Sequence, residues 1–507
     1  MLILIVISLI KVGKMQKNDK ESNASSIVER RGIYYQAFDI YSGVSGFYDY
    51  GPIGLRIKRN IETVWRSIFV DWLGSLEVDT TTIVPEVVLQ ASGHVATFTD
   101  PVSRCKKCGT SYRVDKLLEE FYEKSNDKEA LIELKKLDKK GMQKKLLEHG
   151  LKCQNCAGEL SDIEDFHLMF KLQIGQEKEN IGYLRPETAQ GIFVDFKNLS
   201  KIYGLKLPVA IAQAGKAYRN EISPRQQLVR VREFTQMETE IFFDPDEEQS
   251  SFNDLNIDAM LDSKVNFAPS EGEEKVYAIK ELLEKKYIPN KLFAMCIYSE
   301  LKMLERLGIS DKNIYVFRQL QKEELPHYSK GNVDLEIKTV YGNIEVSGIA
   351  YRTDYDLSQH AKLSGKDISM SLNGKKVVPH VVEASIGLDR LMFSVLDNSV
   401  QEGKERGWEW LKLNEEISPY QYAVFPLQND EDLYKKAEEV LIMLRKRKIP
   451  AYIAKSGSIG KRYARADEIG VPLAITCDYD TLKDNTVTIR SRDTTEQIRK
   501  KINDILS

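Results

Sequence analysis

Arginine and glutamate side chains recur at short spacing in one stretch of the chain. Arg219 and Glu221 are followed by Arg230, Phe234 and Glu238. Guanidinium groups hold phosphate oxygens through paired hydrogen bonds, and an aromatic ring can stack on a flat base. Such a set suits a nucleotide polyphosphate. A charged, solvated sheet face is the alternative that these residues alone leave open.

The elements around this stretch predict a long β-hairpin with a wide tip. Residues 207–218 are apolar and nearly free of charge, which predicts a buried strand, and 231–243 alternate as a second strand would. Residues 220–229 hold Pro, Ser, Asn and Gln, which are typical of a loop. Positions 230, 232, 234 and 238 differ by even steps, so we expect them to share one face.

Four of the six cysteines form two CxxC pairs, Cys105 with Cys108 and Cys153 with Cys156. Each CxxC turn points two thiolates at one centre, so two of them complete a tetrahedral sulphur site. All four positions would be filled by protein, which predicts a structural Zn²⁺ rather than a catalytic ion. Residues 117–147 would form a helical hairpin within this zinc-ribbon-like insert; free thiols are the alternative.

Three further stretches carry polar residues next to apolar runs. Glu187 follows Pro186 at the start of a predicted helix, where it can also simply complement the helix dipole. Glu345 lies in a strand-like segment, and a carboxylate there can hold magnesium on phosphates. Val382 ends an apolar run that leads through Glu383 and Ser385 into a helix carrying Arg390.

Length and composition bound the fold and the function. A chain of 507 residues is too long for one core, so two or three domains are expected. Its net charge of −3 argues against a nucleic-acid packaging protein. Residues 1–25 predict a disordered extension; the apolar run at 1–10 is too short to span a bilayer, and a membrane-surface anchor is the alternative. A cytoplasmic protein is expected.

The pattern of elements predicts an α/β and α+β multidomain protein. Residues 26–417 would form the larger unit with inserts at 103–160 and about 245–340, the second as an inserted subdomain. Residues 418–507 alternate strands and helices, the last helix at 495–505, as in an α/β layer fold. This unit carries cations dense enough for RNA phosphates, although charge runs usually solvate a surface: Lys455, Lys461, Arg462, Arg465, Arg490 and Arg492.

Several of these stretches resemble known motifs. Residues 218–221 (YRNE) with Arg230, Phe234 and Glu238 resemble motif 2 of class II aminoacyl-tRNA synthetases, and GLDR at 387–390 resembles motif 3. A predicted helix over 55–73 and a strand over 77–89 are similar to motif 1, which builds the dimer interface. RPETAQGIF and RNEISPRQQLVRVREFTQ resemble the glycyl-tRNA synthetases of the dimeric archaeal and eukaryotic-like type.

The resemblance implies a class II catalytic core built on an antiparallel sheet, a C-terminal α/β anticodon-binding domain and a homodimer without membrane association. It implies activation of glycine by ATP with Mg²⁺ and transfer to tRNA(Gly). The implied catalytic residues are Arg219, Glu221 and Arg390. The implied ATP-binding residues are Arg219, Asn220, Glu221, Arg230, Val231, Phe234, Glu345, Val346 and Arg390. The implied glycine-binding residues are Arg113, Glu187, Glu238, Glu383 and Ser385, and the implied metal ligands are Cys105, Cys108, Cys153 and Cys156.

The sequence leaves two alternatives open. One is another class IIa synthetase, such as one for proline or threonine, and the other is a synthetase-like accessory protein that binds nucleic acid without catalysis. His94 lies in a segment similar to one that flanks the family's pocket. We expect it to be a hydrogen-bonded structural residue rather than a catalytic one.

Overall fold

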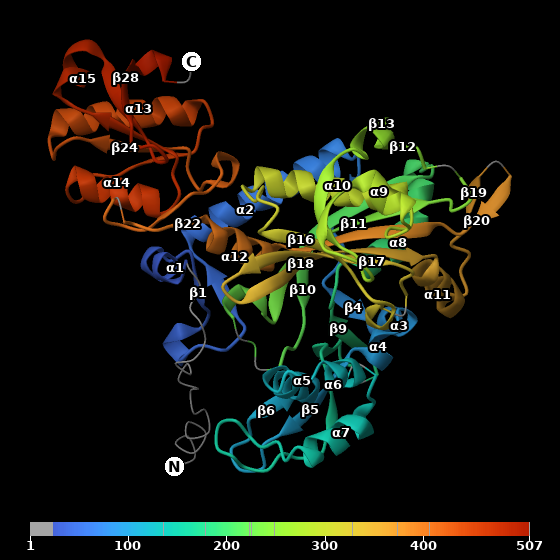
Figure 1. Cartoon of the computed structure of the whole chain (residues 1–507). Coiled ribbons are helices and arrows are strands. Elements are labelled where there is room, and N and C mark those ends of the chain that lie inside the picture. Colours follow the sequence, from blue (N-terminus) through green and yellow to red (C-terminus); the bar gives the residue numbers. More distant parts are fainter. Residues whose placement is uncertain are drawn as a thin grey trace.

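The computed structural model describes residues 24–505, except 135, 178, 223, 225, 248, 327, 373 and 405. Almost all of the predicted extension at 1–25, with its apolar start, lies outside the described residues. Figure 1 shows a large central unit, a smaller lobe that contains α5–α7, and a C-terminal lobe on the opposite side of the central unit. Within the described part of the chain, no helix combines the length and the apolar character needed to cross a membrane.

A mixed, mainly antiparallel sheet forms the centre of the molecule. Among the residues that the structure describes, it has nine strands in the order β15-β14-β16-β17-β18-β21-β11-β10-β3. Their bounds are β3 (Leu76–Glu77), β10 (Val209–Tyr218), β11 (Glu233–Phe243), β14 (Lys264–Ala268), β15 (Lys275–Ala278), β16 (Tyr315–Gln319), β17 (Asn332–Thr339), β18 (Gly342–Thr353) and β21 (His380–Gly387).

The predicted hairpin is confirmed as β10 and β11, which pair antiparallel from Val209↔Phe242 to Tyr218↔Glu233. On its other side β11 pairs with β21, and this register puts Glu238 opposite Ser385 and Glu240 opposite Glu383. Polar residues at alternate positions of β11 therefore meet polar residues of β21 on one face. Met237, Ile241 and Phe243 of β11 point to the opposite face, where Met237 and Ile241 are fully buried.

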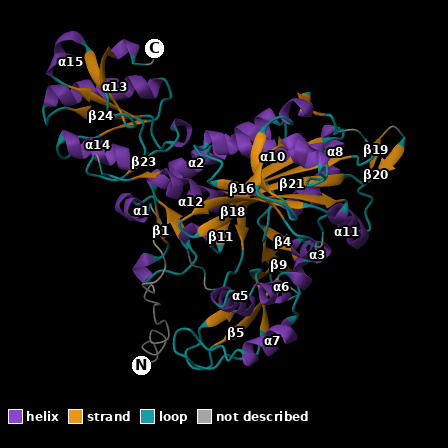
Figure 2. Cartoon of the chain, in the orientation of Figure 1, coloured by secondary structure: helices purple, strands orange, loops and turns teal. Residues whose placement is uncertain are grey.

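Helices cover both faces of the sheet (Figure 2). The largest apolar cluster joins one face to α2 (Pro52–Arg66), α10 (Lys291–Arg306) and α12 (Leu388–Ser399). A second cluster joins the other face to α8 (Ala189–Tyr203) and α11 (Tyr355–Ser364). The predicted amphipathic helix over 55–73 is α2, which continues as a π-helical turn at Ser67–Trp72.

Two expectations for the central unit are wrong. Residues 77–89 are not one strand: β4 (Ile83–Pro85) is followed at once by α3 (Glu86–Ala91). Pro85 accounts for the change, because it ends the strand and precedes the first helical turn. Residues 245–340 do not form a separate subdomain, since their strands extend the central sheet and the α10 side chains join its main apolar cluster.

The insert that carries the CxxC pairs has an apolar cluster of its own. It is built on a three-stranded sheet of β5 (Thr99–Arg104), β6 (Ser111–Arg113) and β7 (Glu164–His167). The expected helical hairpin at 117–147 is instead three helices, α5 (Val114–Lys124), α6 (Lys128–Leu134) and α7 (Lys139–Glu148). Asp138 caps α7 by accepting a hydrogen bond from the amide of Gly141, which starts the extra helix.

The C-terminal unit is an α/β layer with sheet order β25-β24-β26-β27-β28. Its bounds are β24 (Tyr422–Pro426), α13 (Glu431–Lys446), β25 (Ala451–Ile453), α14 (Ile459–Glu468), β26 (Leu473–Cys477), α15 (Tyr479–Asp484), β27 (Thr486–Ser491) and β28 (Gln497–Lys501). The helix expected at 495–505 is wrong. Ile498, Ile502 and Ile505 have helical spacing, but 497–501 pair with β27 as a charged edge strand.

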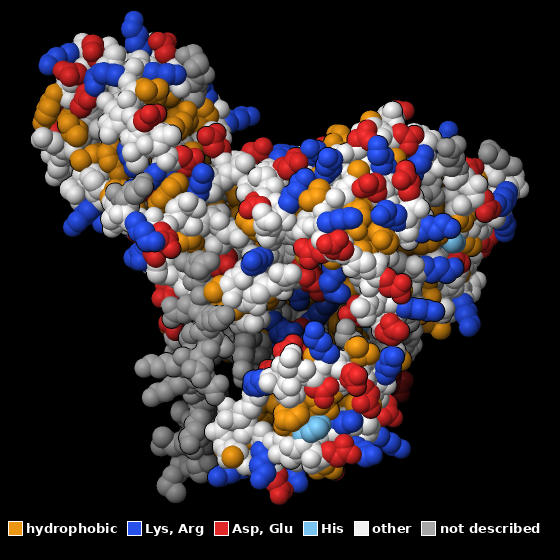
Figure 3. Space-filling view, in the orientation of Figure 1, with side chains coloured by type: hydrophobic (Ala, Val, Ile, Leu, Met, Phe, Trp, Pro, Cys, Tyr) orange, Lys and Arg blue, Asp and Glu red, His pale blue; other side chains and the backbone are white. Residues whose placement is uncertain are grey.

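The remaining described elements are short. They are α1 (Ser25–Arg31), β1 (Tyr34–Gln36), β2 (Tyr48–Tyr50), α4 (His94–Thr97), β8 (Lys171–Gln173), β9 (Ile181–Leu184), β12 (Ser251–Phe252), β13 (Leu255–Asn256), α9 (Ile279–Glu284), β19 (Met370–Leu372), β20 (Lys375–Val377), β22 (Val400–Gln401) and β23 (Trp410–Leu411). Figure 3 shows acidic and basic side chains interspersed over the visible face, in keeping with the small net charge.

Candidate active site

A cavity of about 330 Å³ opens on the polar face of the central sheet. It is walled by β11, β18 and β21, by the loop after β10 and by the start of α12. Twelve of the residues singled out in the sequence line it: Glu187, Arg219, Glu221, Arg230, Val231, Phe234, Glu238, Glu345, Val346, Glu383, Ser385 and Arg390. Residues that lie up to about 200 positions apart in the chain therefore converge on one space.

Arginines and an aromatic ring form one end of the cavity. The guanidinium of Arg219 lies 5.4 Å from the ring centres of both Phe98 and Phe234, so a stack of three groups forms there. Arg230 Nε is 3.7 Å from a carboxylate oxygen of Glu221. Both arginines are at the cavity wall, where their positive charge can meet phosphate oxygens.

Arg390 closes this end from the first turn of α12. Its Nε donates to the carbonyl oxygen of Val229 at 2.9 Å, and its Nη1 donates to that of Glu345 at 3.1 Å. Asp389, one residue earlier, anchors the helix start through Lys58 at 2.9 Å and the amide of Thr235 at 2.5 Å. Arg390 is thus oriented by backbone acceptors on two neighbouring segments.

Buried carboxylates form the other end of the cavity. Glu238 accepts hydrogen bonds from Ser385 Oγ at 2.7 Å, from Gln236 Nε2 at 2.9 Å and from the amide of Thr188 at 3.0 Å. Burial and the charge of Glu187 raise its pKa, against the lowering effect of those hydrogen bonds from Thr188 and Ser385. This carboxyl is therefore short of positive charge in the structure.

Glu187 is held at the entrance to α8. Burial alone would raise its pKa, but His94 and Arg352 beside it bring the pKa below the ordinary value. Nε2 of His94 is 3.5 Å from one oxygen of Glu187, and Gln190 donates to the other at 2.9 Å. His94 in turn lies 2.8 Å from Ser92 through Nδ1, so it is a hydrogen-bonded residue at the edge of this acidic end.

Arg352 was missed by sequence reasoning and proves central to the acidic end. It is 1% exposed and donates to Glu383 at 2.5 Å and to Asp356 at 2.8 and 3.1 Å, and it lies 3.8 Å from Glu187. A charged residue inside an otherwise apolar strand, GIAYR, was the signal in the sequence. Burial raises the pKa of Glu383 to about 7, even though Arg352 opposes the shift.

No sequence signal indicated that Glu240 belongs to the site, because it is one of several polar residues at alternate positions of a predicted strand. It is fully buried, and neither carboxylate oxygen has a hydrogen-bond partner among the residues that the structure describes. Burial and the neighbouring Glu383 raise its pKa well above the ordinary value. The acidic end therefore holds more carboxyl groups than cations, and part of it is protonated near neutral pH.

Arg185 fixes the turn that presents Glu187. It is buried and donates to the carbonyl oxygens of Lys216 at 2.6 Å and of Thr80 at 2.8 Å. Its guanidinium crosses β10 at Gly215, where a Cβ atom would lie 2.3 Å from Nη2 of Arg185. The glycine is needed at this position because any side chain would displace the arginine.

Three expected placements are not found. Arg113 binds Asp115 at 2.6 Å and Asp100 at 3.2 Å and does not line the cavity. Asn220 is also absent from the wall, and its amide donates to the carbonyl oxygen of Leu168 at 2.6 Å. Arg232 does not share the face of Phe234, because β11 begins only at Glu233, and its side chain turns to the carbonyl oxygen of Ser45.

Comparison with known proteins decides the family. Residues 170–399 match the model of the tRNA synthetase class II core domain (G, H, P, S and T), and 421–507 match the anticodon binding domain. Glycine–tRNA ligase of Pyrococcus horikoshii is 40% identical over 96% of this chain and 98% of its own length, and that of Methanocaldococcus jannaschii is 37% identical over 95% and 96%. The chain belongs to the glycine–tRNA ligase family.

Solved structures agree on the fold of this family member. Prolyl-tRNA synthetase of Giardia lamblia in complex with prolyl-adenylate superposes with a TM-score of 0.57 at 14% identity, over 95% of this chain and 75% of that one. The Cryptosporidium parvum prolyl-tRNA synthetase with L-proline and AMP gives the same TM-score at 12% identity, over 96% and 76%. The predicted antiparallel class II core with a C-terminal anticodon-binding domain is thereby confirmed.

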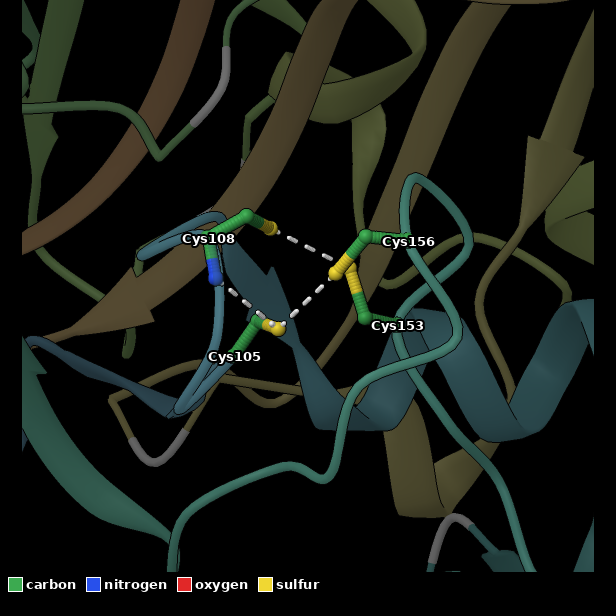
Figure 4. A group of neighbouring side chains, drawn as sticks. All are labelled: Cys105, Cys108, Cys153 and Cys156. Atoms are coloured by element: carbon green, nitrogen blue, oxygen red, sulfur yellow. Dashed lines mark hydrogen bonds between the residues drawn. The ribbon is translucent and has the colours of Figure 1, made fainter.

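The four cysteines of this family member come together as the CxxC spacing predicts. Their sulphur atoms all lie within 4.8 Å of one another, and Figure 4 shows the two turns facing each other. Cys108 Sγ is 3.5 Å from Cys153 Sγ, and Cys105 Sγ is 3.5 Å from Cys156 Sγ. Such distances fit four thiolates around one tetrahedral metal ion.

The basic residues expected to bind RNA divide into two groups. The side chains of Arg462, Arg490 and Arg492 are buried, with exposed fractions of 3%, 5% and 2%. The expectation that these three bind RNA phosphates is therefore wrong. Arg490 binds Asp467 at 2.9 and 3.0 Å, and Arg492 donates to the carbonyl oxygens of Gly470 and Leu413 at 2.7 and 2.8 Å. The other three, Lys455, Lys461 and Arg465, are exposed.

Proposed function

We propose that this protein activates glycine with ATP and transfers it to the 3′ end of tRNA(Gly). Similarity to glycine–tRNA ligases over nearly the whole chain supports the assignment. The single structural observation that carries it is the acidic end of the cavity, where Glu187, Glu238 and Glu383 surround a space next to the arginines. An α-ammonium group supplies the charge that this end lacks.

The cavity orders the two reactants for attack. The glycine carboxylate attacks the α-phosphorus of ATP in line, the bond to the β-phosphate oxygen breaks and pyrophosphate leaves. Arg219 contacts the α-phosphate, and Arg230 and Arg390 contact the rest of a bent triphosphate, so that charge is balanced as it moves. Phe234 stacks on adenine, Glu221 binds its amino group, and Val231 and Val346 line the nucleotide site.

The second step consumes the adenylate. A hydroxyl of the terminal tRNA ribose attacks the glycyl carbonyl carbon, and AMP leaves with the electrons of the broken mixed-anhydride bond. Glu345, at the rim beside Arg390, would hold Mg²⁺, which neutralises phosphate charge when bound. The protein itself contributes position and electrostatics more than acid–base chemistry.

Selectivity for glycine follows from charge and space together. Glycine has no side chain to bind, so recognition uses its ammonium group, which meets Glu187, Glu238, Glu383 and the hydroxyl of Ser385. An added methyl group contributes only about 1–3 kcal/mol of attraction in an apolar pocket, whereas a steric clash excludes it strongly. The side chains around Arg352 are packed by its hydrogen bonds and leave little room to adjust.

Zinc and the dimer are proposed on separate grounds. Cys105, Cys108, Cys153 and Cys156 would hold Zn²⁺ and close the base of the insert. For the homodimer, β3 ends the central sheet and pairs only with β10 among the described residues, which leaves an edge beside α2 for a second copy. The dimer is tested by sedimentation of the full chain.

Amino-acid-dependent ATP–pyrophosphate exchange tests the function. Purified full-length protein is assayed with each of the twenty amino acids in turn. We expect exchange with glycine and none above background with alanine, proline or threonine. Exchange that is faster with proline or threonine than with glycine would reject the assignment, and exchange with none of the twenty would favour a non-catalytic accessory protein.

A further inference from the structure

A second hollow lies at the seam between the central unit and the C-terminal unit. Its volume is about 290 Å³, and its lining comes from α2, from the segment before β24 and from α13 to β25. The lining residues are Arg56, Tyr420, Arg445, Ile449, Pro450 and Tyr452, with Ala451 between the last two. The seam itself is fixed nearby by Asn60 Nδ2, which donates to the carbonyl oxygen of Ser418 at 2.8 Å.

The two arginines of the seam hollow differ from the buried arginines of the C-terminal unit. Arg56 and Arg445 are exposed, and neither forms a hydrogen bond or an ion pair through its side chain with any residue that the structure describes. By contrast, Arg490 is held by Asp467 and Arg492 by backbone carbonyl groups. The charge of Arg56 and Arg445 is therefore available to a ligand.

Two tyrosines complete the hollow. The rings of Tyr420 and Tyr452 lie 4.8 Å apart at 51°, and the guanidinium of Arg56 sits 4.5 Å from the centre of the Tyr420 ring. Neither tyrosine hydroxyl has a hydrogen-bond partner within the described part of the chain. Guanidinium forks and phenol hydroxyls bind phosphate and ribose oxygens, and the rings offer flat apolar surface to a base.

The end of α13 adds further positive charge beside the hollow. Arg445 and Lys446 are the last two residues of α13, and Arg447 and Lys448 follow directly. All four are exposed. An anionic partner is therefore favoured over a neutral one.

We propose that the seam hollow binds a backbone phosphate of the tRNA, with the adjoining ribose or base against Tyr420 and Tyr452. The inference rests on the proposed function. The hollow would contact a part of the tRNA other than the 3′ end, which enters the reaction cavity, and other than the anticodon. A tRNA that places its 3′ end in the cavity and its anticodon on the C-terminal unit must pass the junction of the two units. The hollow lies at that junction and is open to solvent on one side.

The test compares tRNA binding with a reaction that needs no tRNA. Arg56→Ala, Arg445→Ala and the double variant are made in the full chain, with Lys435→Ala as the matched control. Lys435 lies on the same helix as Arg445 and carries the same charge, but it is paired with Glu431 on the solvent side. The dissociation constant for tRNA(Gly) is measured over a series of salt concentrations, and glycine-dependent exchange is measured without tRNA.

We expect each single arginine variant to weaken tRNA binding roughly fivefold at physiological salt, and the double variant, which loses the one phosphate contact, to reduce the log–log salt slope by about 1. Exchange should match that of the unaltered protein, and Lys435→Ala should change neither quantity. Arg445→Lys should retain most of the affinity, since it keeps the charge. Because exchange reports activation alone, failure of the proposed function would appear there and not in the tRNA affinities.

Three results would overturn the proposal. One is a double variant that binds tRNA with the affinity and salt slope of Lys435→Ala. Another is a changed sedimentation mass of the double variant, which would assign the hollow to contact with a second copy. The third is binding of AMP or inorganic phosphate that the double variant abolishes while its tRNA affinity stays that of the unaltered protein, which would assign the hollow to a free phosphate compound.

Discussion

Arg352 and Glu383 form a buried ion pair, with Nη1 of the arginine 2.5 Å from Oε2 of the glutamate. The same guanidinium also binds Asp356 and lies within 4 Å of Glu187, so one cation serves three carboxylates. Glu238 and Glu240 stand close by on β11. An ammonium group entering this end of the cavity therefore completes a charge balance that the protein leaves open.

Replacing Arg352 should destabilise the fold. Arg352→Gln leaves Glu383 and Asp356 buried without a cation, which costs about 3–5 kcal/mol of the free energy of unfolding. The measurement is urea denaturation of the full chain. Lys280→Gln is the control, since its pair with Asp262 is exposed and its removal should leave the free energy of unfolding nearly unchanged. Equal losses in the two variants would contradict the account of Arg352.

Glu187→Gln should impair glycine activation without unfolding the protein. A charge-assisted hydrogen bond contributes about 1.5–3 kcal/mol, so kcat/KM for glycine in exchange should fall roughly 10- to 150-fold. The exposed Glu29→Gln serves as the control and should leave exchange unchanged. Exchange near that of the unaltered protein would remove Glu187 from the glycine site.

Glu300 makes the stability of the central unit depend on pH. It lies on α10, fully buried, and burial raises its pKa from 4.5 to about 8, against a hydrogen bond from Ser347. A carboxyl with a higher pKa in the folded state binds more protons when folded, so stability falls as pH rises from about 4.5 toward 8. The amide of Glu300→Gln still accepts from Ser347 and carries no charge.

We therefore expect Glu300→Gln to be more stable than the unaltered protein at pH 8, with a free energy of unfolding higher by up to about 3 kcal/mol. At pH 4.5 the two proteins should have nearly the same free energy of unfolding. Urea denaturation at both pH values measures the difference. Glu305→Gln on the same helix is the control, because Glu305 is partly exposed and paired with Lys302. A difference between Glu300→Gln and the unaltered protein that grows toward low pH would show that the sign is wrong.

The cysteine cluster should hold one metal ion per chain. Metal analysis of purified protein should find close to one equivalent of zinc, and Cys153→Ser should lower it, because three thiolates bind zinc more weakly than four. Cys296→Ala is the control, since Cys296 is buried in the central unit away from the cluster. Less than half an equivalent of zinc in the unaltered protein would end this assignment.

Arg490 and Lys461 should behave differently although both were candidates for RNA contact. Arg490→Ala removes the two short hydrogen bonds to buried Asp467 and leaves it only the longer contacts with Arg406 at 3.6 Å and Trp408 at 3.3 Å, so it should destabilise the C-terminal unit by about 3 kcal/mol. Lys461→Ala should leave unfolding unchanged and weaken tRNA binding severalfold at low salt. Thermal unfolding and tRNA binding of the two variants separate these effects; the reverse pattern would contradict the burial argument.

Much of the central fold was predictable because local patterns agree with tertiary structure there. The apolar run before Tyr218 and the alternation before Phe243 correspond to β10 and β11, and Gln236 and Glu238 of β11 line the cavity. Secondary structure can be predicted from sequence where apolar residues recur with a clear period and form one buried face. The cysteine pairs were predictable for a simpler reason, since CxxC spacing fixes the geometry of each turn.

Other features depended on contacts that no local pattern contains. The strands at 264–278 read as parts of a subdomain because nothing in their sequence reveals that β16 pairs with β14 on one side and β17 on the other. Arg490 and Arg492 read as surface cations because their acceptors lie in distant segments. The role of Arg352 likewise needed three partners brought together from separate elements.

The two ends of the insert that carries the cysteine cluster meet at a single point. The amide of Leu168 donates to the carbonyl oxygen of Phe98 at 3.2 Å, Phe98 stacks on Arg219, and the carbonyl oxygen of Leu168 accepts from the amide of Asn220. A segment attached by such a narrow neck can be lengthened, trimmed or exchanged without rethreading the sheet. Yet the neck contacts Arg219, so any movement of the lobe is transmitted to the arginine end of the cavity.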